Sequence, residues 1–278
     1  MRKLMCRNNC MLFWKGNANL DQCLECNASR WKLDKKNEMD DDIPYFPSKK
    51  IPIKTLHYFP LVPRLQRLFM SSKTTANMRW HDEKHVNDEV ASHPTDSLAW
   101  KKFDEMHPSF ASEPRNVRLG LAIDGFNLFG SMSVSYSNWP IVVFPYNLPM
   151  WMYMKKPFFM LSLFIPGLEA PKDKIDVCLR PLIEELKMLW EVGIETYNAS
   201  KNHNFMMRAA VLWTISDFLA YADLSGWSTK GKWDCPSCNK YTSSLYLRYG
   251  MKTCYTCHRK FLPINHKWRY DRRHFDGT

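Results

Sequence analysis

The sequence has no long apolar run. Its longest, FFMLSLFI, has eight residues, whereas a helix that spans a bilayer needs about 20, so we expect neither a transmembrane helix nor a membrane partner. The N-terminal stretch MRKLMCRNNCMLFWKG is basic, but its apolar part is short and is interrupted by polar residues and two cysteines. It therefore lacks the pattern of a signal peptide. Without one, we expect the chain to stay in a reducing compartment, where paired cysteines bind metal more often than they form disulfides.

Two further signals are absent: a dense cluster of Lys and Arg, and the signature of an RRM or KH domain. The second absence weakens the case for an RNA-binding zinc-ribbon protein.

The sequence has the composition of a folded protein. The 278 residues are 45% hydrophobic and 14% aromatic, enough for one or two domains with a sizeable core. The net charge of +11 favours a polyanionic partner such as nucleic acid.

Eight of the nine cysteines fall into two groups of four. Each group has two close pairs, with twelve residues between the pairs in the first group and fifteen in the second. The first group is Cys6, Cys10, Cys23 and Cys26, and the second is Cys235, Cys238, Cys254 and Cys257. Four soft ligands in two pairs are typical of a tetrahedral Zn²⁺ site. The alternative is that the thiols are free or form disulfides, and the wider first pair of the first group is less standard for zinc.

The fourth ligand of the second group stays open. His258 directly follows Cys257, so either residue could complete the site, and His266 is a more distant candidate. Both zinc sites are expected to be structural, because four protein ligands leave no open position for a water. The ninth cysteine, Cys178, lies in a helical pattern and is expected to be a packed thiol.

The chain from residue 115 alternates between strand and helix patterns. Residues 117–124 alternate apolar and small or polar side chains and end at Asp124. Two β-rich runs follow, SVSYSNWPIVVFPYNL with a break at its Trp-Pro pair, and PFFMLSLFIPG. An amphipathic helix then ends near Gly193. The last strand, VLWTIS, ends at Asp217. This order predicts an α/β fold with a mixed sheet, in which a right-handed crossover can place the fourth strand beside the first.

The two aspartates would then lie at the ends of neighbouring strands. Two carboxylates so placed repel each other unless a cation lies between them, and oxygen ligands suit Mg²⁺ or Mn²⁺. Paired divalent ions held by carboxylates are the machinery of polymerases and nucleases. The alternative is that Asp124 and Asp217 each cap a turn, because Asp-Gly after a strand is a common turn signal.

Several ordered motifs resemble the transposases of plant CACTA elements, also called the En/Spm type. The motifs that carry the resemblance are RWKLDKK, YFPLVPRLQRLF, MRWH, RNVRLGLAIDGFNLFG, YNLPMWM, FFMLSLFIPG, LRPLIEEL, AAVLWTISDFLAYADLSGWSTKG and CPSC. The match runs from about residue 6 to the end of the chain. It implies a cut-and-paste transposase with a ribonuclease-H-like catalytic core, in which an acidic triad, DDE, binds two divalent ions.

The resemblance assigns roles to particular residues. Asp124 matches the first catalytic aspartate, in a DGFN motif, and Asp217 matches the second, in a DFPAY motif that reads DFLAY here with Leu219 at the proline. The usual C-Y-x-G-H reads CYTCH, with Cys257 at the glycine, so the resemblance favours Cys235, Cys238, Cys254 and His258 as the zinc set.

The third acidic residue of the family lies well downstream, in a segment absent from this chain. We therefore expect a truncated and inactive copy of the transposase.

These expectations divide the chain into four parts. They are an N-terminal zinc-binding module (1–34), a linker with short helices that include an N-cap at Thr95 (35–114), the first part of an incomplete ribonuclease-H-like core (115–222), and a zinc-ribbon-like insertion and tail (223–278). The implied function is metal-dependent cleavage and strand transfer of DNA at transposon ends and targets, in the nucleus, with a homo-oligomer left open. The competing hypothesis is a non-enzymatic zinc-containing DNA-binding protein derived from a transposase.

Overall fold

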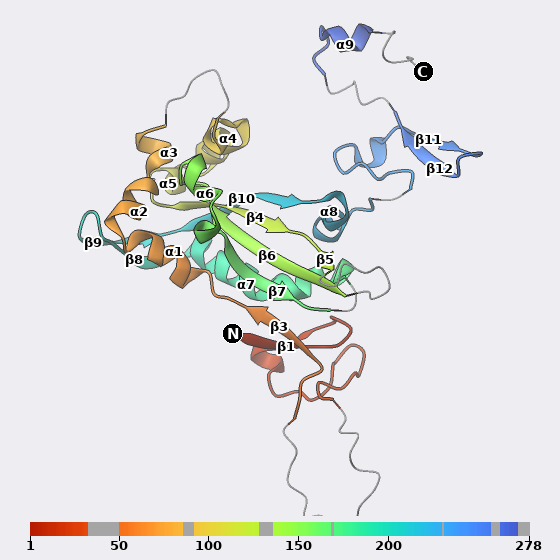
Figure 1. Ribbon diagram of the computed structural model, residues 1–278, viewed down its shortest axis with the longest axis horizontal. Helices are drawn as coiled ribbons and strands as arrows, with labels where there is room; N and C mark the ends of the chain where they lie inside the picture. Colours follow the sequence, from red (N-terminus) through yellow and green to blue (C-terminus); the bar gives the residue numbers. More distant parts are fainter. Residues whose placement is uncertain are drawn as a thin grey trace, which may run out of the picture. The chain divides into compact units, whose positions relative to one another are not determined.

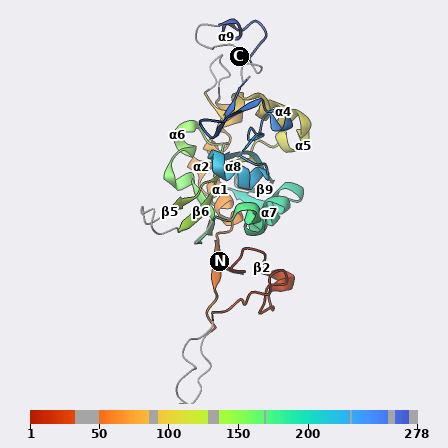
Figure 2. The same ribbon diagram turned by 90° about the vertical axis from the view of Figure 1, so that its right-hand side faces the viewer.

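The computed structural model describes residues 1–32, 50–85, 92–127, 136–167, 170–229, 231–256 and 262–271. The chain divides into two compact units, Met1–Ala220 and Tyr221–Thr278 (Figures 1 and 2). Among the described helices, none combines the length and the apolar character needed to cross a bilayer.

One mixed sheet organises the first unit. Its strands are β1 (Arg2–Met5), β2 (Leu12–Phe13), β3 (Lys54–Tyr58), β4 (Val117–Ile123), β5 (Phe126–Asn127), β6 (Ser137–Pro145), β7 (Met160–Ile165) and β10 (Ala209–Ser216). Their order is β10-β4-β6-β7-β3-β1-β2, with β5 pairing β6 (Figure 1). Only the β10–β4 pair is parallel; every other neighbouring pair is antiparallel. The mixed α/β sheet is therefore confirmed, and so is the return of the fourth predicted strand beside the first.

Helices pack around this sheet. The helices of the first unit are α1 (Val62–Phe69), α2 (Ser72–Asn77), α3 (Trp80–Glu83), α4 (Leu98–Met106), α5 (Pro108–Ala111), α6 (Met150–Tyr153) and α7 (Ile175–Glu191), with 3-10 turns at Lys15–Asn17, Pro94–Asp96, Lys156–Phe158 and Lys172–Lys174. A separate hairpin joins β8 (Ile194–Asn198) to β9 (His203–Met207). The predicted amphipathic helix is α7, which packs against β3, β7 and β10. Gly193 follows it with φ +81°, the left-handed conformation that glycine adopts most easily.

Both faces of β4 are buried, although its sequence alternates. Val117 and Leu119 are buried on one face, as expected, and Arg118 is buried on the other. The expected close packing beside small residues is confirmed at Gly120, where an added Cβ would lie 2.6 Å from the ring of Phe144. A strand covered on both faces needs a layer of side chains on each side, and that fixes β4 in the centre of the unit.

Three local expectations differ from the structure. The segment interpreted as linker and short helices contains strand β3, which joins β1 to β7. The N-cap of α4 is Ser97, whose Oγ accepts from the amide of Trp100 at 3.2 Å, because Thr95 lies in the preceding 3-10 turn. Pro140 does not break β6, since it lies beyond the last β4–β6 pair and needs no amide for that ladder.

β3 has a consequence for the first cysteine group. β1 and β2, which flank its first pair of cysteines, pair with each other, and β1 also pairs with β3. The N-terminal segment is therefore continuous with the main sheet.

The second unit is small. Helix α8 (Phe218–Ser225) begins at its boundary, and η5 (Asn239–Tyr241), the antiparallel hairpin β11 (Ser244–Leu247) and β12 (Lys252–Tyr255), and α9 (Lys267–Tyr270) follow. Its core among the described residues is limited, because Cys238 is its main buried apolar side chain.

Candidate carboxylate and metal sites

Asp124 and Asp217 lie at the same end of two adjacent parallel strands. The last pair of the β4–β10 ladder is Ile123 with Ser216, and each aspartate is the next residue of its strand. Neighbouring strands are about 4.8 Å apart, so the two residues emerge side by side. Both residues are exposed.

A bulge in β10 sets this alignment. The register shifts by one residue between Val211 and Trp213, so that Leu212 has no partner of its own on β4. Without this extra residue, Asp124 would face Ser216 and not Asp217. A shift of one residue also turns a side chain to the opposite face of the sheet. The bulge therefore places the backbone positions of the two aspartates opposite each other, directly beyond the last pair of the ladder.

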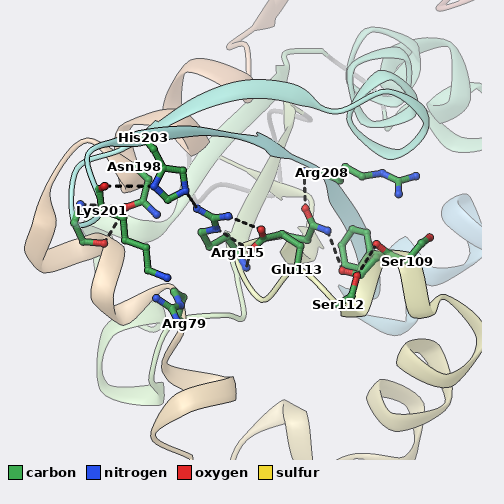
Figure 3. A network of polar contacts seen from close by, with 12 residues as sticks. Arg79, Ser109, Ser112, Glu113, Arg115, Asn198, Lys201, His203 and Arg208 are labelled. Atoms are coloured by element: carbon green, nitrogen blue, oxygen red, sulfur yellow. Dashed lines mark hydrogen bonds and ion pairs between the residues drawn. The ribbon is translucent and has the colours of Figure 1, made fainter.

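A polar network holds the other end of the same two strands. Asn116, the residue before β4, accepts from the amide of Arg208, the residue before β10, at 2.8 Å through Oδ1. Arg115 donates through Nε to Glu113 Oε1 at 2.7 Å, and its Nη1 lies 3.0 Å from Nε2 of His203 (Figure 3). The bond between Asn116 and Arg208 joins the starts of β4 and β10, whereas Arg115 connects the segment before β4 to β9.

The surroundings of the two carboxylates differ. Asp217 Oδ1 accepts from the amide of Ala220 at 2.6 Å, which is an N-cap contact for α8. Asp124 makes no hydrogen bond or ion pair with a described residue. Its successor Gly125 packs on Trp139, because an added Cβ would lie 2.7 Å from the indole ring. The glycine of the Asp-Gly pair is thus needed for packing, and the capping role expected under the alternative interpretation is seen at Asp217.

The first cysteine group forms a compact cluster. The sulfurs of Cys6, Cys10, Cys23 and Cys26 all lie within 4.8 Å of one another, and those of Cys6 and Cys26 are 3.4 Å apart. A disulfide needs about 2.05 Å, whereas Zn–S bonds of about 2.3 Å at tetrahedral angles place sulfurs about 3.8 Å apart. The donor set and the spacing therefore fit a structural metal ion such as zinc.

Local backbone geometry forms this cluster. Asn9, inside the first pair, and Asn27, directly after the second, have φ of 60° and 55°, a left-handed conformation that Asn tolerates better than most residues. The amide of Asn8 donates to Cys6 Sγ at 3.4 Å. These turns direct amides toward the sulfurs, an arrangement that stabilises thiolates.

The thiols of the cluster are electrostatically distinct. The amide of Ala28, followed by the neighbouring thiols, lowers the pKa of Cys26 to about 6, whereas burial raises the pKa of Cys10. Lys174, at the start of α7, donates to Cys10 Sγ at 3.4 Å, and this contact raises the pKa of Lys174. The lowered pKa of Cys26 and the ammonium group of Lys174 favour negatively charged sulfur, whereas burial favours the neutral thiol by raising the pKa of Cys10 and that of Cys6, the latter to about 12.

The second cysteine group is only partly described. Cys238 is buried, and hydrogen bonds from its backbone amide lower the pKa of Cys235, as in one knuckle of a zinc site. Cys257 and His258 lie outside the described residues. Within the described part of the chain, the Cys6 cluster is the group that unites three or more His, Cys, Asp or Glu ligands, and Nδ1 of His266 accepts from the amide of Trp268.

The sequence matches transposase family tnp2 over residues 88–278, which is well over half of the chain. The chain belongs to transposase family tnp2. The match contains both aspartates and the second cysteine group, whereas the Cys6 cluster precedes it. No curated protein and no solved structure matches the chain. Membership of this transposase family implies that DNA is a partner.

Three features of this transposase have no signal in the sequence. They are the bulge at Leu212, the hydrogen bond from the amide of Arg208 to Asn116, and the contact of Lys174 with Cys10. Each joins residues far apart in the chain, so spacing and periodicity give no indication of them.

Proposed function

We propose that this chain is the DDE-type transposase of a CACTA, or En/Spm-type, DNA transposon, with a ribonuclease-H-like core. In this proposal Asp124 and Asp217 hold a divalent ion, Mg²⁺ or Mn²⁺, during cleavage and strand transfer of DNA. The observation that carries it is the parallel β4–β10 ladder, which ends at both aspartates in register. Further support comes from the family, from the crossover helix α7 and from the net charge of +11.

The two aspartates have the chemistry that this role needs. When bound, a divalent ion between carboxylates activates the attacking oxygen and stabilises the leaving oxygen. Oδ1 of Asp217 is held by the amide of Ala220, which orients the carboxylate and leaves Oδ2 available as a ligand. Asp124 provides the opposing oxygens, and its exposure leaves room for a phosphodiester.

Two-metal phosphoryl transfer needs more carboxylate ligands than these two. No third His, Cys, Asp or Glu side chain of the described residues forms a cluster with Asp124 and Asp217. We therefore expect the 278-residue chain to bind a divalent ion without robust DNA cleavage.

The proposal is tested by titrating Mn²⁺ into the purified chain and following the free ion by electron paramagnetic resonance. Asp124→Asn and Asp217→Asn are each expected to weaken Mn²⁺ binding by at least tenfold, because each replaces a charged carboxylate ligand with a neutral amide of the same size. The control, Asp176→Asn, changes an exposed carboxylate at the start of α7 and should leave binding unchanged. If all three variants bind Mn²⁺ as the wild type does, the two aspartates are not metal ligands.

The capping contact allows a second discrimination. Asparagine retains the ability to cap α8, whereas alanine does not. Asp217→Asn should therefore lose Mn²⁺ binding at nearly wild-type stability, and Asp217→Ala should lose both, with a stability cost of about 1 kcal/mol. A variant pair that differs in stability but binds Mn²⁺ equally well would leave Asp217 with a capping role alone.

A second candidate function is a non-enzymatic zinc-containing DNA-binding protein derived from a transposase. The compact Cys6 cluster and the positive charge favour it, and both persist without carboxylate chemistry. DNA binding without measurable Mn²⁺ binding would identify this function. For either function we expect the nucleus as the location, which a fluorescent fusion of the full chain would check.

A further inference from the structure

The positive charge of the chain is concentrated in its second unit. Residues Tyr221–Thr278 contain eleven Lys and Arg against four Asp and no Glu, so this unit carries +7 of the net +11. The first unit, almost four times longer, carries the remaining +4. The electrostatic attraction to a polyanion is therefore strongest, per residue, in the small unit.

The β11–β12 hairpin of this unit exposes both of its faces. Its register pairs Leu245 with Cys254 and Tyr246 with Thr253, so Leu245 and Tyr246 point to opposite faces. Leu245 is 60% exposed and Tyr246 is 61% exposed. A two-stranded hairpin with two open faces is marginally stable in water on its own, and its open apolar faces indicate a surface that contacts a partner.

The tip of the hairpin combines apolar side chains with flanking cations. The connection consists of Arg248, Tyr249, Gly250 and Met251, and Lys252 opens β12. Tyr249 is completely exposed, at 102% of its reference surface, and Met251 is 81% exposed. An aromatic ring and a thioether thus project from the tip between two positive side chains, Arg248 and Lys252.

This combination fits DNA better than a charge-neutral partner. Phosphates attract the two cations, and aromatic or apolar side chains stack on bases or insert between base steps. The family of this chain implies that DNA is the partner. An antiparallel hairpin is also narrow enough to enter a DNA groove.

We propose that the β11–β12 hairpin is a DNA wedge, in which Tyr249 and Met251 insert between bases while Arg248 and Lys252 contact the flanking phosphates. The inference rests on DNA as the partner in the proposed function, but it is independent of metal binding by Asp124 and Asp217. The two proposals can fail separately, because the wedge is tested by DNA binding and the metal site by Mn²⁺ binding.

The stacking part is tested with the full chain and a duplex that contains 2-aminopurine, whose fluorescence rises when it is unstacked. Wild type and Tyr249→Phe should both raise the fluorescence, because phenylalanine retains the ring. Tyr249→Ala should abolish the rise and weaken DNA binding by roughly fivefold or more. The matched control, Tyr197→Ala on β8, removes a tyrosine that is 46% exposed and should behave as the wild type does.

The electrostatic part is tested by the salt dependence of DNA affinity. The double variant Arg248→Ala/Lys252→Ala should lower the log–log salt slope by about 1.8, since each phosphate contact contributes about 0.9. The control Lys101→Ala/Lys102→Ala removes the same charge from two exposed residues of α4 and should leave the slope unchanged. Circular dichroism and zinc content verify that each variant is folded.

Three results would overturn the proposal. In the first, Tyr249→Ala retains the fluorescence rise and the affinity of the wild type, so the tip does not insert. In the second, both double variants lower the slope equally, so the charge acts diffusely. In the third, the wild type sediments as a dimer and Tyr249→Ala as a monomer with unchanged DNA binding, so the hairpin binds a second copy of the chain.

Discussion

Removal of the Asp104 carboxylate is expected to destabilise the first unit strongly, because Asp104 neutralises a buried arginine. Arg118 is 2% exposed and donates to Asp104 Oδ1 through Nη2 at 2.6 Å and through Nε at 3.3 Å. Its guanidinium also lies 4.7 Å from the ring centre of Trp100 and 5.2 Å from that of Phe110. The remaining polar neighbours of the guanidinium are 3.5 Å away, which is too far to replace the carboxylate.

The expected loss of stability depends on which partner is removed, because Arg118 is buried and Asp104 is partly exposed. Loss of one partner of a buried ion pair costs about 3–5 kcal/mol. The side chain of Asp104 is 30% exposed, so water can partly replace it, and we expect Asp104→Asn to cost about 3 kcal/mol. Arg118→Met should cost less, about 1 kcal/mol, because it removes the buried charge and leaves a carboxylate that water can reach.

A double-mutant cycle measured by urea denaturation checks the coupling between Asp104 and Arg118. Asp104→Asn/Arg118→Met should be about as stable as Arg118→Met alone, which corresponds to a coupling of about 2–3 kcal/mol. Additive losses, or a loss below about 1 kcal/mol for Asp104→Asn, would refute the argument and show that the aromatic rings or water stabilise the guanidinium.

Two further predictions concern the metal cluster and the pH dependence of stability. Elemental analysis should find close to two zinc ions in the wild-type chain. Cys23→Ser should lose one of these ions and unfold at a lower temperature. The control Cys178→Ala should retain both ions. Burial, followed by the charge of Arg118, lowers the pKa of His81 to about 3, from about 6.5 in the unfolded chain. Its contribution to stability is therefore complete above pH 6.5 and is lost as pH falls, by about 2 kcal/mol at pH 5. The free energy of unfolding is measured by denaturation at pH 7.5 and at pH 5. The difference between the two values should be smaller in His81→Phe than in the wild type and unchanged in His203→Phe.

Helix α7 and strand β4 show which parts of the fold could be predicted. The apolar side chains of α7 recur at helical intervals, and those of β4 alternate, because each element must turn one face to the core. The burial of Arg118 could not be predicted, since it depends on Trp100, Phe110 and Asp104 from other elements. β3 was also missed, because five residues without a long periodic pattern become a strand only when β1 and β7 pair with them.

For the candidate sites, the sequence by itself determined the chemical groups and their order: an aspartate at the end of each of two strands, and four cysteines in two close pairs. These are local properties, because side-chain spacing and turn residues act over a few positions. Only the tertiary structure decided that the two strands end in register one residue before each aspartate, through the bulge at Leu212, and that Lys174 contacts Cys10. Contacts between distant segments depend on strand register and packing, which are properties of the whole unit and leave no mark in the spacing of residues.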